Sequence, residues 1–100
     1  MSRENQIATA VMKIAASQKS GIATFKRCYV EVPHHLKLSA AETSLSATRP
    51  GEPMWHQLVR NIRCHHDADG NFIDRGLLEH VPKVGYRITN AGRQSLTKKP

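Results

Sequence analysis

A chain of 100 residues has the size of one domain, and it is long enough to bury a modest core without disulfides or a metal ion. Its 15 Lys and Arg against 8 Asp and Glu give a formal net charge of +7, which favours nucleic acid as a partner, although an acidic protein or an anionic membrane surface also fits. No stretch approaches the roughly 20 apolar residues of a membrane span, and the sequence has neither a signal-peptide run nor a Cys-x-x-Cys pair, so we expect a cytoplasmic protein that does not enter a membrane.

Two helices are predicted in the N-terminal third of the chain. The first covers residues 6–16, where apolar side chains recur at helical spacing at Ile7, Val11, Ile14 and Ala15. Thr24 is suited to cap the second helix, which runs to Val32, because a proline such as Pro33 cannot lie deep inside a helix. Residues 30–32 also have the β-branched composition of a strand, so this segment keeps a second interpretation.

A third helix is predicted in the middle of the chain. Ser39 and Glu42 have the spacing of a capping box that opens one or two helical turns, and residues 48–53 form a loop. Pro53 suits the first turn of a helix over residues 53–66. At about 100° per residue, one side of this helix carries Met54, Trp55, Leu58, Val59, Ile62 and His66. The other side carries His56, Gln57, Arg60, Arg63 and Cys64.

A β-hairpin and a last helix complete the chain. After a polar turn at residues 67–71, Phe72 and Ile73 return to the core. Strands at residues 77–81 and 86–89 flank the tight segment 82–85, and Thr89 or Asn90 caps the final helix. The inner side of the hairpin is predicted to consist of Leu77, Leu78, Tyr86 and Ile88. We therefore expect one α+β domain over residues 1–96, followed by a solvated tail at residues 97–100.

A three-helix cluster followed by a hairpin is the layout of the winged helix-turn-helix, in which the third helix enters the major groove and the hairpin, or wing, reaches the DNA backbone. The cationic and amide groups on the third helix and hairpin are then the candidate DNA contacts: His56, Gln57, Arg60, Arg63, Lys83 and Arg87. The same helix pattern also fits an ordinary amphipathic helix whose outer face is basic and solvated. Trp55 is predicted to be a core residue.

Other kinds of site receive less support. Residues 64–67 read Cys-His-His-Asp, but contiguous side chains cannot all face one ion, so we expect no bound metal. Residues 67–71 resemble part of a calcium loop, but the glycine comes too early for one. The sequence contains no nucleophile elbow or phosphate-binding glycine loop, so we expect a protein without enzymatic activity or cofactor.

From about residue 24 to residue 96, the sequence resembles the N-terminal winged-helix domain of Mrr-type restriction endonucleases. The resemblance is carried by residues 36–39 (LKLS), 51–53 (GEP), the Val59-Arg60 helix, 76–79 (GLLE) and 85–93 (GYRITNAGR). It implies DNA binding by the third helix and the wing. The family's cleavage activity is not implied, because a carboxylate–lysine nuclease motif is missing from the chain, and residues 66–75 are longer than the usual link between helix and strand.

The sequence thus predicts a non-catalytic protein that binds double-stranded DNA, either a small bacterial transcriptional regulator or a DNA-targeting accessory subunit. The alternative is a winged-helix interaction module whose basic face binds an acidic protein. Such modules often act as two-fold dimers, so a homodimer is a further hypothesis. Its contact would come from the first or the last helix, through Ile7, Val11, Ile14 or Leu96.

Overall fold

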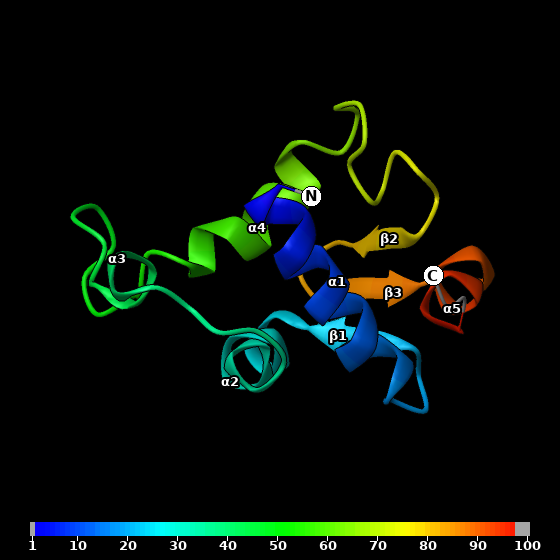
Figure 1. Ribbon diagram of the computed structural model, residues 1–100, viewed down its shortest axis with the longest axis horizontal. Helices are drawn as coiled ribbons and strands as arrows, with labels where there is room; N and C mark the ends of the chain where they lie inside the picture. The colour runs from blue at the N-terminus through cyan, green and yellow to red at the C-terminus, as the bar shows by residue number, and fades with distance from the viewer. Residues whose placement is uncertain (1, 98–100) are drawn as a thin grey trace.

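The computed structural model describes residues 2–97. It is an α+β fold in which helices surround a small antiparallel sheet (Figure 1). The elements in chain order are α1 (Arg3–Ala16), β1 (Ile22–Thr24), α2 (Phe25–His35), α3 (Ala40–Thr43), α4 (His56–Cys64), β2 (Leu78–Val81), β3 (Gly85–Ile88) and α5 (Asn90–Thr97). Of the predicted tail at residues 97–100, Thr97 is exposed and ends α5, and residues 98–100 lie outside the described part.

The sheet has three strands in the order β1-β3-β2, with both pairings antiparallel. The hairpin of β2 and β3 was predicted, whereas β1 was not. β1 has only three residues, too few for an alternating pattern to stand out in the sequence. It becomes a strand because Ala23 pairs with Tyr86 in β3, so the hairpin predicted as an isolated ribbon is extended by a third strand.

Helix α1 lies against the sheet and contacts α2, α4 and α5 as well (Figure 1). It begins at Arg3, three residues earlier than predicted, because the Ser2 side chain accepts a hydrogen bond from the Asn5 amide and caps it. Its apolar side chains are fully buried at Ile7, Val11 and Ile14. These three residues belong to the core of the domain, so the predicted dimer contact through them is wrong. Of the residues suggested, only Leu96 is partly exposed.

The predicted caps of the next two helices are confirmed. Thr24 accepts a hydrogen bond from the Arg27 amide, and Ser39 and Glu42 form a complete capping box at α3. Residues 30–32 are helical, which decides between the two interpretations of that segment. Helix α2 continues past Pro33 to His35, because the proline lies in the last turn, where little of the helix depends on its missing N–H group.

Helix α4 is shorter than the predicted 53–66. Pro53 does not open it but pairs with Leu45 in an isolated bridge, and a turn at residues 54–55 precedes the first helical residue. The buried position of Trp55 is confirmed, since only 4% of its surface is exposed. Met54 and His66, predicted to pack with it, are exposed because they lie outside the helix, where its angular spacing does not apply.

The C-terminal elements depend on two close backbone contacts. A Cβ atom at Gly85 would overlap the Ala23 carbonyl oxygen, and one at Gly92 would overlap the Leu77 carbonyl oxygen. Thr89 accepts a hydrogen bond from the Gly92 amide at 2.9 Å, which confirms it as the cap of α5. The predicted core positions are also buried or packed against the core: Phe72, Ile73, Leu77, Leu78, Tyr86 and Ile88.

Candidate nucleic-acid interface

A buried tyrosine fixes α4 to the sheet. The Tyr86 hydroxyl donates to the Val59 carbonyl at 2.6 Å and accepts from the Arg63 amide at 3.1 Å. These are the two groups that a regular α-helix pairs with each other, so the hydroxyl bridges one turn of α4. Burial is the largest cause of a raised Tyr86 pKa, which keeps the phenol protonated and able to donate at neutral pH. The orientation of α4 on the sheet is therefore set by a specific polar contact as well as by packing.

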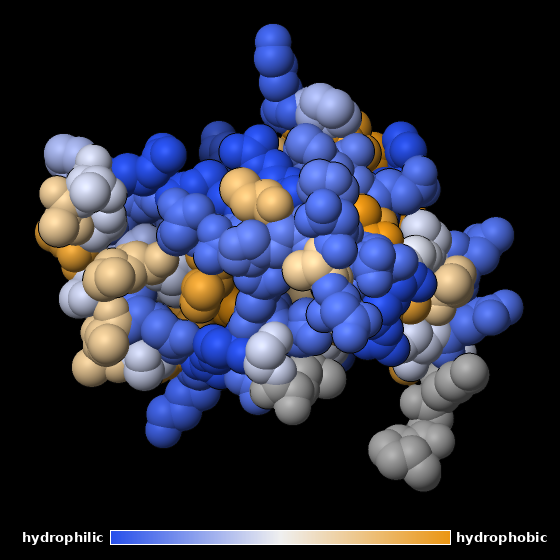
Figure 2. All heavy atoms as spheres, turned by 90° about the horizontal axis from the view of Figure 1, so that it is seen from above, coloured by the Kyte–Doolittle hydropathy of each residue, from blue (hydrophilic) through white to orange (hydrophobic). Residues whose placement is uncertain are grey.

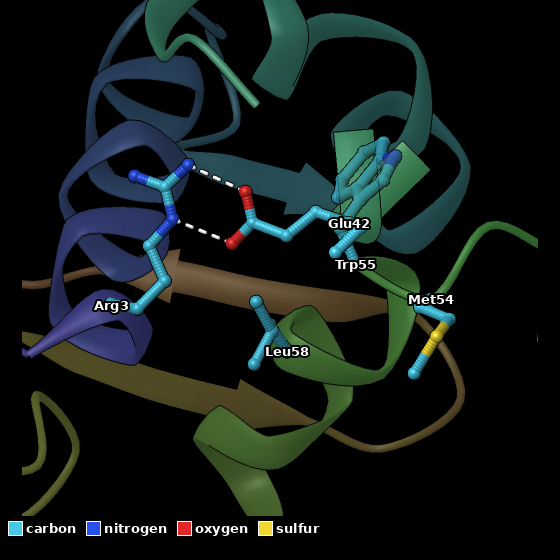
Figure 3. A pocket seen from close by; sticks show the side chains of 6 residues that line it. Arg3, Glu42, Met54, Trp55 and Leu58 are labelled. Carbon is cyan, nitrogen blue, oxygen red and sulfur yellow. Dashed lines mark hydrogen bonds and ion pairs between the residues drawn. The ribbon is translucent and has the colours of Figure 1, made fainter. Parts of the chain in front are cut away.

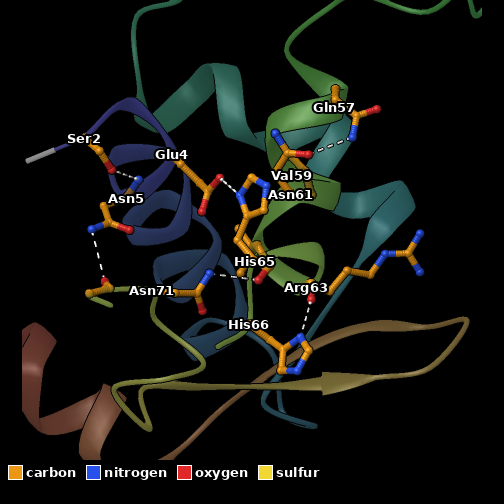
Figure 4. A network of polar contacts seen from close by, with 12 residues as sticks. Ser2, Glu4, Asn5, Gln57, Val59, Asn61, Arg63, His65, His66 and Asn71 are labelled. Carbon is orange, nitrogen blue, oxygen red and sulfur yellow. Dashed lines mark hydrogen bonds and ion pairs between the residues drawn. The ribbon is translucent and has the colours of Figure 1, made fainter. Parts of the chain in front are cut away.

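The C-terminal end of α4 is held by a second set of polar contacts (Figure 4). Asn71 is buried, and its side-chain nitrogen donates to the Ile62 carbonyl at 3.0 Å while its oxygen accepts from the Ile73 amide at 2.7 Å. His65 and Glu4 are joined at 2.8 Å, which links the end of α4 to the start of α1. The sequence identified residue 71 only as part of a turn, because nothing local shows that an asparagine side chain is buried.

With both ends fixed, α4 exposes one polar face. Val59 and Ile62 are fully buried, so the opposite side of the helix points outward. We name this side the outward face of α4; it consists of Gln57, Arg60, Asn61 and Cys64. Asn61 was missed by the sequence interpretation, which singled out cations, histidine and glutamine. Its position four residues after Gln57 was the signal that would have found it.

Arg60 lies on this face but is occupied within the chain. Its Nη2 donates to Glu52 Oε1 at 2.6 Å and to Gln57 Oε1 at 2.9 Å, while its Nη1 is 3.4 Å from the Tyr29 hydroxyl. Only 11% of the Arg60 side chain is exposed. The hydrogen bond from Arg60 is also the largest cause of a lowered Glu52 pKa. Arg60 therefore organises the surface around it, and its charge is matched before any partner arrives.

His56 lies at the edge of α4 and is half-buried. Its ring stacks on Tyr29 with 4.0 Å between centroids and meets the edge of Trp55 at 4.5 Å. Its pKa is lowered, mainly by burial, so the imidazole is neutral at physiological pH. His56 thus contributes to packing between α2 and α4 rather than to the positive charge of the outward face.

Phe25 contacts both Arg63 and the hairpin turn that carries Lys83. The Arg63 guanidinium carbon is 5.4 Å from the centre of the Phe25 ring, and the Phe25 amide donates to the Val84 carbonyl in the hairpin turn at 2.9 Å. Lys83 is exposed in that turn and has a φ of 65°, which together with Pro82 before it corresponds to a type II turn. In Figure 4 the Arg63 side chain extends from α4 on the same side as the hairpin turn.

Arg87 is not brought to this surface. Tyr86 points from β3 toward α4, and successive side chains of a strand point to opposite faces, so Arg87 lies on the outer face of the sheet. There it is opposite Glu79 in the neighbouring strand. Of the predicted contacts, His56, Gln57, Arg60 and Arg63 share α4. Lys83 lies in the hairpin turn, which Phe25 contacts through Val84, and Arg87 is separate.

A cavity of about 320 Å³ opens beside α4 and is lined by Arg3, Ala41, Glu42, Met54, Trp55 and Leu58. Figure 3 shows the Arg3 guanidinium and the Glu42 carboxylate facing each other there, with two nitrogen–oxygen contacts of 2.7 Å. The hydrogen bond from Arg3 is the largest cause of a Glu42 pKa of about 2. Figure 2 shows hydrophilic side chains over most of one face of the molecule, with apolar ones gathered at the end that carries α3.

Comparison with known proteins gives no match to a family model, to a curated protein or to a solved structure. Within residues 2–97, no group of three or more His, Cys, Asp or Glu side chains is arranged to hold a metal ion. In the same part of the chain, none of the helices combines the length and apolar character needed to cross a bilayer.

Proposed function

We propose that this chain is a non-catalytic winged helix-turn-helix protein that binds double-stranded DNA, with α4 in the major groove and the β2–β3 hairpin on the backbone. The observation that carries the proposal is the polar outward face of α4, fixed to the sheet by Tyr86 and flanked by Arg63 and the basic hairpin turn. The succession of the helices α1 to α4 and a hairpin is compatible with that fold, and a net charge of +7 favours a polyanion.

In this proposal, the cations divide into two groups. Lys83 at the exposed turn and Arg63 beside Phe25 meet phosphates, which supplies affinity without sequence preference. Arg60 is held by Glu52 and Gln57, so it contributes less to this affinity for phosphates. The cellular role that fits is that of a small cytoplasmic transcriptional regulator or a DNA-targeting accessory subunit.

The test is a fluorescence-anisotropy titration against a randomised 30-base-pair duplex and the matched single strand, at low and near-physiological salt. We expect duplex binding that weakens steeply with salt. Arg63→Glu and Lys83→Glu should each weaken it and lower the salt slope by about one. Lys19→Glu, the same charge change at an exposed position between α1 and β1, is the matched control and should act much less. Equal effects of all three variants would mean that DNA binding depends only on the net charge of the protein and not on this surface.

The second candidate is a protein interaction module for an acidic partner. The observation that favours it is the exposed apolar side chain of Val84 beside Lys83 in the hairpin turn, which a protein partner can bury and a phosphate backbone cannot. Absence of binding to either strand form at low salt would select this candidate.

A further inference from the structure

We infer that α4 reads adenine through the side-chain amide of Asn61, and that Gln57 and Arg60 act as positioning residues for it. The inference rests on the proposed binding of duplex DNA and adds the base that is recognised and the residues that recognise it.

The observation is a chain of hydrogen bonds along the outward face of α4. Arg60 donates to Gln57 Oε1 at 2.9 Å, and Gln57 Nε2 donates to Asn61 Oδ1 at 2.7 Å. A guanidinium can only donate, so the oxygen of Gln57 must face Arg60 and its nitrogen must face the oxygen of Asn61. The orientation of both amides follows from Arg60, whose own position is fixed by Glu52 and Tyr29.

This order of hydrogen bonds leaves the Asn61 amide with the free donor and acceptor that adenine requires. Asn61 Oδ1 uses one lone pair on Gln57 and retains another, and among residues 2–97 no acceptor is bonded to its Nδ2. An asparagine or glutamine amide pairs with adenine by donating to N7 and accepting from N6. Asn61 lies at the edge of the outward face farthest from Arg60, and we place its unpaired Nδ2 and the second lone pair of its Oδ1 against a base edge in the groove.

Guanine is the less favoured base for the same reason. Guanine is usually read by an arginine that donates to O6 and N7. Arg60 is the arginine nearest Asn61 on this face, and two of its nitrogens already bond to Glu52, Gln57 and Tyr29. Turning it toward a guanine would leave the Glu52 carboxylate unpaired and release both amides. Because Arg60 is fixed in place, recognition of a base by the Asn61 amide is favoured over recognition by Arg60.

The experiment is selection of preferred sites from a randomised duplex library with the full chain, followed by titration of the selected site and of its single-base variants. We expect at least one adenine position whose replacement by guanine weakens binding about 5- to 150-fold. Asn61→Ala should remove this discrimination and leave the salt slope unchanged. Gln94→Ala, which removes an exposed amide on α5, should preserve both.

Arg60→Met tests the positioning role. It should reduce the adenine preference in the wild-type background and have no further effect on it in the Asn61→Ala background. Equal weakening for all sequences would instead mean a structural role. Thermal unfolding of each variant separates loss of fold from loss of readout.

The outcomes distinguish this inference from the proposed function. Absence of duplex binding by the wild-type chain overturns both. Duplex binding without base preference, or an adenine preference that survives Asn61→Ala, overturns the readout and leaves DNA binding in place. A guanine preference lost in Arg60→Met would assign the reading to Arg60 itself.

Discussion

At Gly92, helix propensity and tertiary packing predict opposite changes in stability for a substitution by alanine. Inside a helix, Gly→Ala stabilises by about 1 kcal/mol. At Gly92 the added Cβ would overlap the Leu77 carbonyl oxygen and lie 2.8 Å from Ile88 Cγ1. Overpacking of this kind costs about 1–3 kcal/mol. The same Leu77 carbonyl accepts hydrogen bonds from the amide and the hydroxyl of Thr89, so moving it weakens the cap of α5 by about 1 kcal/mol more.

The expected net effect of Gly92→Ala is a loss of about 1–3 kcal/mol in the free energy of unfolding. Urea denaturation followed by the fluorescence of Trp55, the single tryptophan of the chain, measures it. Ser95→Ala is the matched control, because this position is exposed on the same helix and gains only helix propensity. If Gly92→Ala raised the stability as Ser95→Ala does, the close contact between Gly92 and the Leu77 carbonyl would be refuted.

Three further outcomes are expected. Tyr86→Phe should lower the free energy of unfolding by about 1–3 kcal/mol, because the two backbone groups of α4 that the hydroxyl bridges lose a buried partner; an unchanged urea midpoint would count against this. The Glu42 pKa is lowered from 4.5 to about 2, so the stability contributed by its pair with Arg3 is present above pH 4.5 and lost as the pH falls toward 2. The stability difference between wild type and Arg3→Met should therefore shrink between pH 7 and pH 2.5 in urea denaturation. Bound duplex should protect Cys64, exposed on the outward face of α4, from alkylation measured by mass spectrometry, whereas Cys28, buried with a pKa of about 12, should stay unmodified in both states. Unchanged Cys64 labelling would place the DNA elsewhere.

The local signals in the sequence determined much of the secondary structure. The caps at Thr24, Ser39 and Thr89 were predicted and are confirmed, because a cap is a hydrogen bond between residues three apart and needs no tertiary contact. The burial of Leu78 and Trp55 was also predicted, since the hydrophobic effect places large apolar side chains inside.

Tertiary structure alone decided what depends on residues far apart in the chain. β1 exists because Ala23 pairs with Tyr86, and no property of three residues reveals such a partner. The candidate site changed for the same reason. Arg60 is engaged by Glu52 and by Tyr29, a residue 31 positions away. The predicted DNA contact Arg60 is therefore occupied within the chain, and the adjacent Asn61 keeps free hydrogen-bonding groups. A sequence shows which groups a helix carries, but which of them remain available is set by the side chains that folding brings against them.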